Sequence, residues 1–134
     1  MSGQSRVVQV AIESYKDLDV WQVAMTLAED CYLLTARFPK DEMYGMSSQI
    51  RRAAVSIPAN IAEGYGRDQT GSFVQFLRIA QGSARELETH LILAESIRLV
   101  DQEAVAPLQE LCERVSKMFR PLIRSLEARR ANKE

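Results

Sequence analysis

The chain has 134 residues, of which 46% are hydrophobic and 26% are charged, and its formal net charge is −1. These values are typical of a single globular domain with a sizeable core, and they argue against a disordered chain. A net charge so close to zero excludes a simple polycation that binds nucleic acid or an acidic membrane through its overall field.

The N-terminal segment has no features of a targeting signal. Its apolar run, from Val7 to Ile12, is shorter than the roughly 7 to 15 residues of a secretory signal core. No stretch approaches the roughly 20 apolar residues of a membrane span. Cys31 and Cys112 match no metal or redox spacing and lie in apolar helical patterns, which favours buried free thiols. We therefore expect a flexible tail over residues 1–14 and a cytoplasmic protein with no membrane partner.

Hydrophobic periodicity predicts four helices joined by short polar loops. The first should begin at Asp17 or Asp19 and end near residue 37, the second should span about 42–62, the third should run from 71 or 72 to 99, and the fourth should begin between 101 and 107. Gly64 and Gly66 should end the second helix. Pro107 suits a first helical turn, and Pro121 predicts a kink or a local break.

These elements predict an all-α fold, an antiparallel up-down four-helix bundle over residues 15–127 followed by a charged tail over residues 128–134, which we expect to fray. Apolar residues on the first and third helices exceed what one bundle core can bury. We expect copies of the chain to associate in a symmetric ring or dimer. The predicted interface residues are Trp21, Met25, Ile79, His90, Leu93 and Ile97. Alternatively, these residues pack against the N-terminal tail.

The segment over residues 49–67 combines an apolar core stripe with a polar stripe beside it. The polar stripe consists of Gln49, Arg52, Ser56, Asn60 and Glu63, at steps of three or four residues. Arg52 is expected to hold a carboxylate such as Glu63 or Glu88. Pro58 lies inside this helix, where a proline ordinarily costs about 3 kcal/mol. The pattern indicates buried hydrogen bonds or a surface that meets a partner.

Residue types suited to catalysis or metal binding are present but are not suitably spaced. His90 is the only histidine, and Glu86 and Glu88 stand at the wrong offsets for the Glu-x-x-His pairs of a di-iron bundle. Zinc-ligand spacing is absent, and the glycines at 64 and 66 follow a helix rather than the strand of a phosphate-binding loop. We expect no enzymatic activity, no metal and no cofactor.

The predicted fourth helix carries a basic stripe. Its residues are Arg114, Lys117, Arg120 and Arg124, again at steps of three and four. Such a stripe could bind nucleic-acid phosphates, and a ring would repeat it into a multivalent surface. The alternative is a solvated helix face that stabilises the helix C-terminus.

Several strings of the sequence resemble one known family. They are Tyr15-Lys-Asp-Leu18, Val20-Trp-Gln22, Phe38-Pro39, Tyr44-Gly45, the segment over residues 49–67 with its Arg-Arg-Ala and Asn-Ile-Ala-Glu-Gly strings, and the segment over residues 76–91. Together, over about residues 15–126, they resemble the four-helix bundle family of 23S rRNA intervening-sequence proteins. The resemblance implies a homopentamer and makes these strings a structural signature of bundle and ring.

The family shares its fold with accessory proteins of diversity-generating retroelements, whose pentamers bind a reverse transcriptase and nucleic acid. Those proteins are strongly basic, and the near-neutral charge of this chain departs from that pattern. We therefore expect a non-enzymatic, oligomeric binding module that contacts RNA or a nucleoprotein partner, such as a protein of the reverse-transcriptase type. The alternative is a scaffold that recognises only protein.

Overall fold

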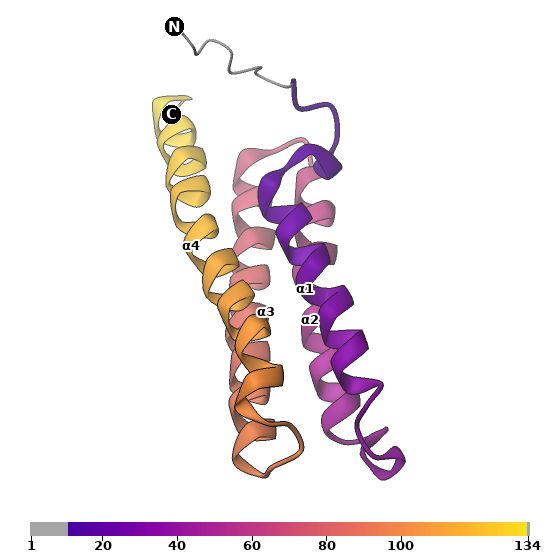
Figure 1. The fold of residues 1–134 in the computed structure, drawn as a ribbon. Coiled ribbons are helices and arrows are strands. Elements are labelled where there is room, and N and C mark those ends of the chain that lie inside the picture. Colours follow the sequence, from indigo (N-terminus) through magenta and orange to yellow (C-terminus); the bar gives the residue numbers. More distant parts are fainter. Residues whose placement is uncertain (1–10, 134) are drawn as a thin grey trace, which may run out of the picture.

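The structure, a computed structural model, describes residues 11–133 and consists of four helices (Figure 1). These are α1 (Asp19–Thr35), α2 (Met46–Tyr65), α3 (Thr70–Ser96) and α4 (Gln102–Lys133), with short 3-10 turns at η2 (Tyr15–Asp17) and η3 (Lys40–Glu42). No strand occurs between residues 11 and 133. The predicted all-α fold with four helices is confirmed.

Each helix packs against two others. α1 contacts α2 and α4, and α3 also contacts α2 and α4, so the four helices enclose one core (Figure 1). Each contributes a fully buried large side chain, such as Leu27, Ile57, Leu87 and Phe119. Burying one such side chain stabilises the fold by about 1.5 to 3 kcal/mol, so this core is the main source of stability.

The turn between α3 and α4 is defined by local hydrogen bonds. The backbone N–H of Leu99 donates to the carbonyl of Ala94 at 2.9 Å, and Arg98 has a φ of 66°. This is the arrangement of a Schellman cap, in which the left-handed position usually carries glycine. The side chain of Asp101 then accepts a hydrogen bond from the N–H of Ala104 at 2.9 Å and caps α4.

Glycine and proline had only part of their expected effects on the helix ends. Gly64 lies inside α2 and is buried, whereas Gly66 is the C-cap residue, so one of the two predicted glycines ends the helix. α4 begins at Gln102, within the predicted range, which places Pro107 in the second turn. It continues through Pro121, so of the kink or local break expected there the break does not occur. α2 also starts later than expected, at Met46, because a 3-10 turn precedes it.

The two ends of the described chain can be compared with the tails expected over residues 1–14 and 128–134. Residues 1–10 of the predicted N-terminal tail lie outside the described residues, whereas Ser14 caps η2 by accepting a hydrogen bond from the N–H of Lys16 at 3.0 Å. The segment from Ala128 was expected to be a frayed tail. In the structure it is helical and continues α4 as far as Lys133. None of the described helices is both long enough and apolar enough to cross a lipid bilayer.

The buried position of Gly64 sets the approach of α2 to α3. A Cβ atom at Gly64 would lie 2.6 Å from the Cβ of Phe76 and 3.3 Å from the carbonyl oxygen of Phe73. Real Cβ atoms do not approach other atoms as closely as the first of these distances, so only glycine fits here without a shift. The two helices are therefore in direct backbone-level contact at this end of their interface.

Candidate functional site

The predicted basic stripe lies on the surface of α4. Arg114, Lys117, Arg120 and Arg124 are all exposed. Lys117 is partly neutralised by Glu113, whose Oε2 lies 3.9 Å from Nζ one turn away. Arg114, Arg120 and Arg124 form no ion pair with any described residue. The stripe therefore contains three arginines whose charge no neighbouring carboxylate offsets.

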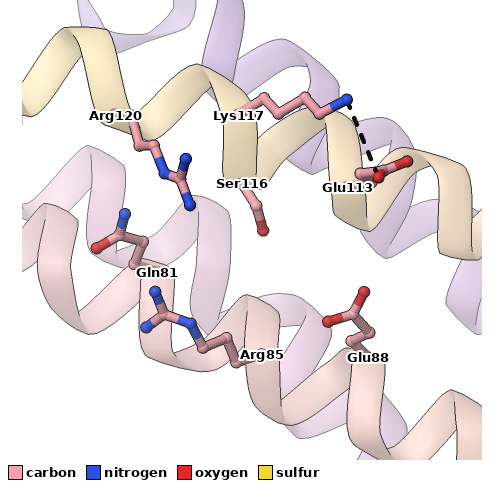
Figure 2. A pocket seen from close by; sticks show the side chains of 7 residues that line it. All are labelled: Gln81, Arg85, Glu88, Glu113, Ser116, Lys117 and Arg120. Atoms are coloured by element: carbon pink, nitrogen blue, oxygen red, sulfur yellow. Dashed lines mark ion pairs between the residues drawn. The ribbon is translucent and has the colours of Figure 1, made fainter.

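A cleft of about 270 Å³ separates this part of α4 from α3. It is lined by Gln81, Arg85, Glu88, Glu113, Ser116, Lys117 and Arg120. Figure 2 shows Arg85 and Arg120 extending from the two helices into the same space, near the amide of Gln81 and the hydroxyl of Ser116. Three cationic and two anionic side chains line the cleft, which leaves it one formal positive charge.

The two arginines and the two carboxylates of the cleft lie toward opposite ends of it. Figure 2 shows Glu88 and Glu113 at the end away from the guanidinium groups of Arg85 and Arg120, with Lys117 beside Glu113. An adjoining groove continues the acidic end and is lined by Glu88, Glu110 and Glu113. The sequence did not predict that Arg85 lies beside the basic stripe, because this position depends on how α3 packs on α4.

The predicted polar stripe on α2 forms a smaller network than expected. The hydroxyls of Ser56 and Ser83 are 2.7 Å apart, and the amide nitrogen of Asn60 donates to the Ser56 hydroxyl at 2.9 Å and to the Ser56 carbonyl at 2.7 Å. Ser83 is buried in α3. These three side chains connect α2 to α3, so their role is structural.

The other members of the predicted network lie elsewhere. Arg52 does not hold Glu63 or Glu88: Glu63 binds Arg67 at 2.7 Å, four residues later and just beyond the end of α2. Glu88 lines the cleft beside α4. The side chains of Gln49 and Arg52 are exposed, and within residues 11–133 they form no hydrogen bond or ion pair.

Arg51, next to Arg52 in the sequence, connects α2 to α1. Its Nε donates to the hydroxyl of Thr35 at 2.7 Å. Its guanidinium also lies 4.8 Å from the centroid of the Tyr32 ring, a cation–π distance. The sequence alone therefore does not tell whether an arginine on a helix surface is unpaired or is bound by a residue of a neighbouring helix.

The predicted oligomer-interface residues form two separate surfaces. On α3, Ile79, Leu93 and Ile97 are 49%, 46% and 53% exposed, although all three are apolar. His90 lies on the same helix, half-buried, with Nε2 3.5 Å from Oε2 of Glu86. Within the described part of the chain, that nitrogen is buried and has no hydrogen-bond partner.

The second surface lies on α1 and α2. Trp21 is half-buried and packs edge-to-face with Tyr15, their ring centroids 5.3 Å apart. Met25 lines an apolar groove of about 520 Å³ between the two helices. The groove is lined by Met25, Ala28, Glu29, Tyr32, Leu33, Val55 and Pro58.

The two cysteines are buried free thiols, as predicted. Burial raises the pKa of the Cys112 thiol from its ordinary value of 9.0 to about 12, and the Glu88 carboxylate adds to the rise. Burial also raises the pKa of Cys31 beyond the usual range, with smaller contributions from Cys112 and Asp30. Both thiols are therefore protonated at neutral pH and are poor nucleophiles.

Comparisons with known proteins agree with the resemblance seen in the sequence. The family described as 23S rRNA-intervening sequence protein matches residues 16–120. A crystal structure of a protein with unknown function from the S23 ribosomal protein family of Bacteroides thetaiotaomicron has a similar fold, with a TM-score of 0.70 and 24% sequence identity. The similarity covers 78% of this chain and 97% of that one. No curated protein matches. The chain belongs to the family of 23S rRNA-intervening sequence proteins.

Proposed function

We propose that this protein is a non-enzymatic, oligomeric module that binds structured RNA, alone or within a nucleoprotein partner. The observation that carries the proposal is the set of three arginines on α4, Arg114, Arg120 and Arg124, which are exposed and have no carboxylate partner among the described residues. Arginines in this state are available to nucleic-acid phosphates, and their binding releases the counterions condensed on the nucleic acid.

The proposed assembly is a homopentameric ring of antiparallel up-down bundles. Two contacts support the opposite directions of α2 and α3, because Ser56 meets Ser83 whereas the later Gly64 meets the earlier Phe76. The apolar groove between α1 and α2 and the apolar strip on α3 support association. They lie on different helices, so a copy that fits its strip into the groove of the next makes a head-to-tail contact, which forms a ring where the rotation between copies closes.

Light scattering tests the assembly. The unmodified protein should have a mass several times that of the 15.1 kDa chain. Replacing Leu93 and Ile97 with glutamate should reduce that mass, because charged side chains would enter an apolar contact. A single-chain mass for the unmodified protein at high concentration would contradict the ring.

Charge reversal tests RNA binding. A K117E/R120E/R124E variant should lose retention of a structured RNA at low salt, because three cations become anions on one helix face. Each phosphate contact contributes about 0.9 to the slope of log affinity against log salt concentration, so the slope should also fall. A variant with R37E, K40E and R98E, all at exposed positions, is the matched control and should retain RNA. Purified protein that is free of nucleic acid and does not bind RNA in low-salt buffer would refute the proposal.

A protein-only scaffold is the second candidate function. The apolar groove of about 520 Å³ supports it, since apolar grooves commonly receive a helix of a partner protein. Recovery of one defined partner that is unaffected by nuclease and by the K117E/R120E/R124E change, but is lost when Leu33 and Val55 become glutamate, would favour this function over RNA binding.

A further inference from the structure

Two arginines from different helices converge in the cleft between α3 and α4. Arg85 projects from α3 and Arg120 from α4 into the same space (Figure 2). Neither guanidinium forms an ion pair or a hydrogen bond with any residue that the structure describes. Like charges held close together repel, so an anion placed between them would be attracted by both.

Some arginines of the protein are engaged by their neighbours. Arg78, two turns before Arg85 on α3, binds Oε2 of Glu127 at 3.2 Å. Arg67 binds Glu63 at 2.7 Å, and Arg51 donates to Thr35 at 2.7 Å. Other exposed arginines have no partner among the described residues, so Arg85 and Arg120 are distinguished by lining one cleft from two helices rather than by being unpaired.

The polar groups beside the two arginines suit an anion with several acceptor oxygens. Figure 2 shows the amide of Gln81 beside the two arginines and the hydroxyl of Ser116 in the middle of the cleft, and each can donate a hydrogen bond. Guanidinium groups bind phosphate in a bidentate geometry, which lysine does not reproduce. A volume of about 270 Å³ admits a phosphate group together with water.

The acidic end of the cleft limits where an anion can bind. Glu88 and Glu113 lie away from the two arginines, and Lys117 lies 3.9 Å from Glu113. A second phosphate beside these carboxylates would be repelled. The cleft therefore has room for one anionic group, at the end formed by Arg85 and Arg120.

We propose that this cleft is a phosphate-binding site, in which Arg85 and Arg120 bind one phosphate group and Gln81 and Ser116 donate hydrogen bonds to it. The proposal deepens the proposed function and rests on it for the source of the phosphate, an RNA backbone phosphodiester. The same chemistry would bind free inorganic phosphate, so the experiment contains an arm for each source.

Three variants make the test specific. R85Q and R120Q each remove one guanidinium from the cleft and keep a long polar side chain. R78Q is the matched control, because it removes the same charge from α3 at a position already neutralised by Glu127. Circular dichroism and thermal melting in chloride buffer establish that each variant folds, which exposed polar substitutions should allow.

In the first arm, the melting temperature is measured in phosphate, in acetate and in chloride at equal ionic strength. Phosphate alone should raise the melting temperature of the unmodified protein and of R78Q, by a few degrees at about ten times its dissociation constant. The rise should disappear in R85Q and R120Q. In the second arm, the affinity for a short structured RNA is measured against salt. R85Q and R120Q should each lower the slope of log affinity against log salt concentration by about 1, and R78Q should not.

The outcomes separate this proposal from the proposed function. If the variants lose the phosphate effect but no form of the protein binds RNA, the site is supported as a free-phosphate site and RNA binding is refuted. If RNA binds and only the RNA arm responds to R85Q and R120Q, the site is supported with RNA as its source. If R85Q and R120Q match R78Q in both arms, or if acetate protects as well as phosphate does, the phosphate site is overturned while RNA binding stands on its own test.

Discussion

Helix α3 packs against α2 on one side and α4 on the other, and the two interfaces differ in kind. The α2 side is closed: Gly64 leaves no space for a Cβ atom, and Ser56 and Ser83 meet at 2.7 Å. The α4 side holds a charged cleft of about 270 Å³. Close backbone packing leaves a ligand nowhere to enter, whereas long charged side chains hold space open between helices. The most distinctive sequence segment of the chain thus describes packing, and the chemistry that can bind a ligand lies on the opposite side of α3.

The largest effect should come from filling the closed interface. Gly64→Ala should destabilise the protein by about 3 kcal/mol, because the new methyl group must displace Phe76 or the backbone of α3. Chemical denaturation measures the change. Gly82→Ala is the matched control on α3: nothing lies within 4 Å of the added Cβ, so it should stabilise the helix by about 0.5 to 1 kcal/mol. Equal effects of the two changes would show that the closed interface can relax.

Alkaline pH should test the burial of the thiols, one of which lies beside Glu88 of the cleft. The pKa of Cys112 rises from 9.0 to about 12 on folding, so below pH 9 both states keep the proton and the stability is fully present. Above pH 9 the unfolded state releases protons that the folded state retains, and the free energy of unfolding should fall by about 1.4 kcal/mol per pH unit for each thiol. Cys31, whose pKa burial raises in the same direction, should add to this loss.

Urea denaturation between pH 8 and pH 11 measures this slope. A C31A/C112A variant should begin less stable, because it contains cavities, but should lose stability less steeply as the pH rises. Parallel curves for the two proteins would mean that the thiols are exposed to solvent in the folded state.

Removing one serine hydroxyl should have a different effect on stability at each of the two interfaces of α3. Ser83→Ala removes a buried hydrogen bond to Ser56 and should cost about 1 kcal/mol. Ser116→Ala, in the cleft, should change the free energy of unfolding by no more than about 0.5 kcal/mol. Thermal denaturation of both variants provides the comparison, and a larger cost at Ser116 would show that the cleft contributes to folding.

The smallest stability effect should come from the cleft arginine itself. Arg85→Gln should leave the free energy of unfolding within about 0.5 kcal/mol of the unmodified value, because Arg85 is exposed and forms no ion pair with any described carboxylate. Its effect should instead be seen in phosphate binding. A marked loss of stability in chloride buffer would assign Arg85 a structural role. It would contradict the view that the α4 interface, unlike the α2 interface, is available to a ligand.

The helices themselves were predictable, because their periodic apolar residues report local structure directly. The order and number of helices are as expected, and α3 begins within two residues of the predicted start. The inward face of α4 depends on packing as well as on spacing. Leu108, Val115 and Phe119 are buried, whereas Leu111 and Met118 are only partly buried beside them. An apolar helix with two adjacent apolar stripes does not by itself reveal which stripe faces inward.

Partners across helices were not predictable. Arg52 was expected to hold Glu63 or Glu88, yet Glu63 binds Arg67 and Glu88 lines the cleft. The prediction that Gly64 helps to end the second helix failed for a similar reason, since Gly64 lies within α2 and is buried there. In both cases the residue type was informative, but its role depends on what a neighbouring helix places beside it.

By itself, the sequence determined the helical class, the family and the basic stripe of α4, because spacing along one helix decides which side chains share a face. Only the tertiary structure decided that Arg85 joins Arg120 in one cleft while Arg51 and Arg78 are engaged by neighbours. The reason is that an arginine is available to a ligand only when no side chain on an adjacent helix binds its guanidinium group. The rotation of each helix about its own axis determines which side chains lie close enough to do so.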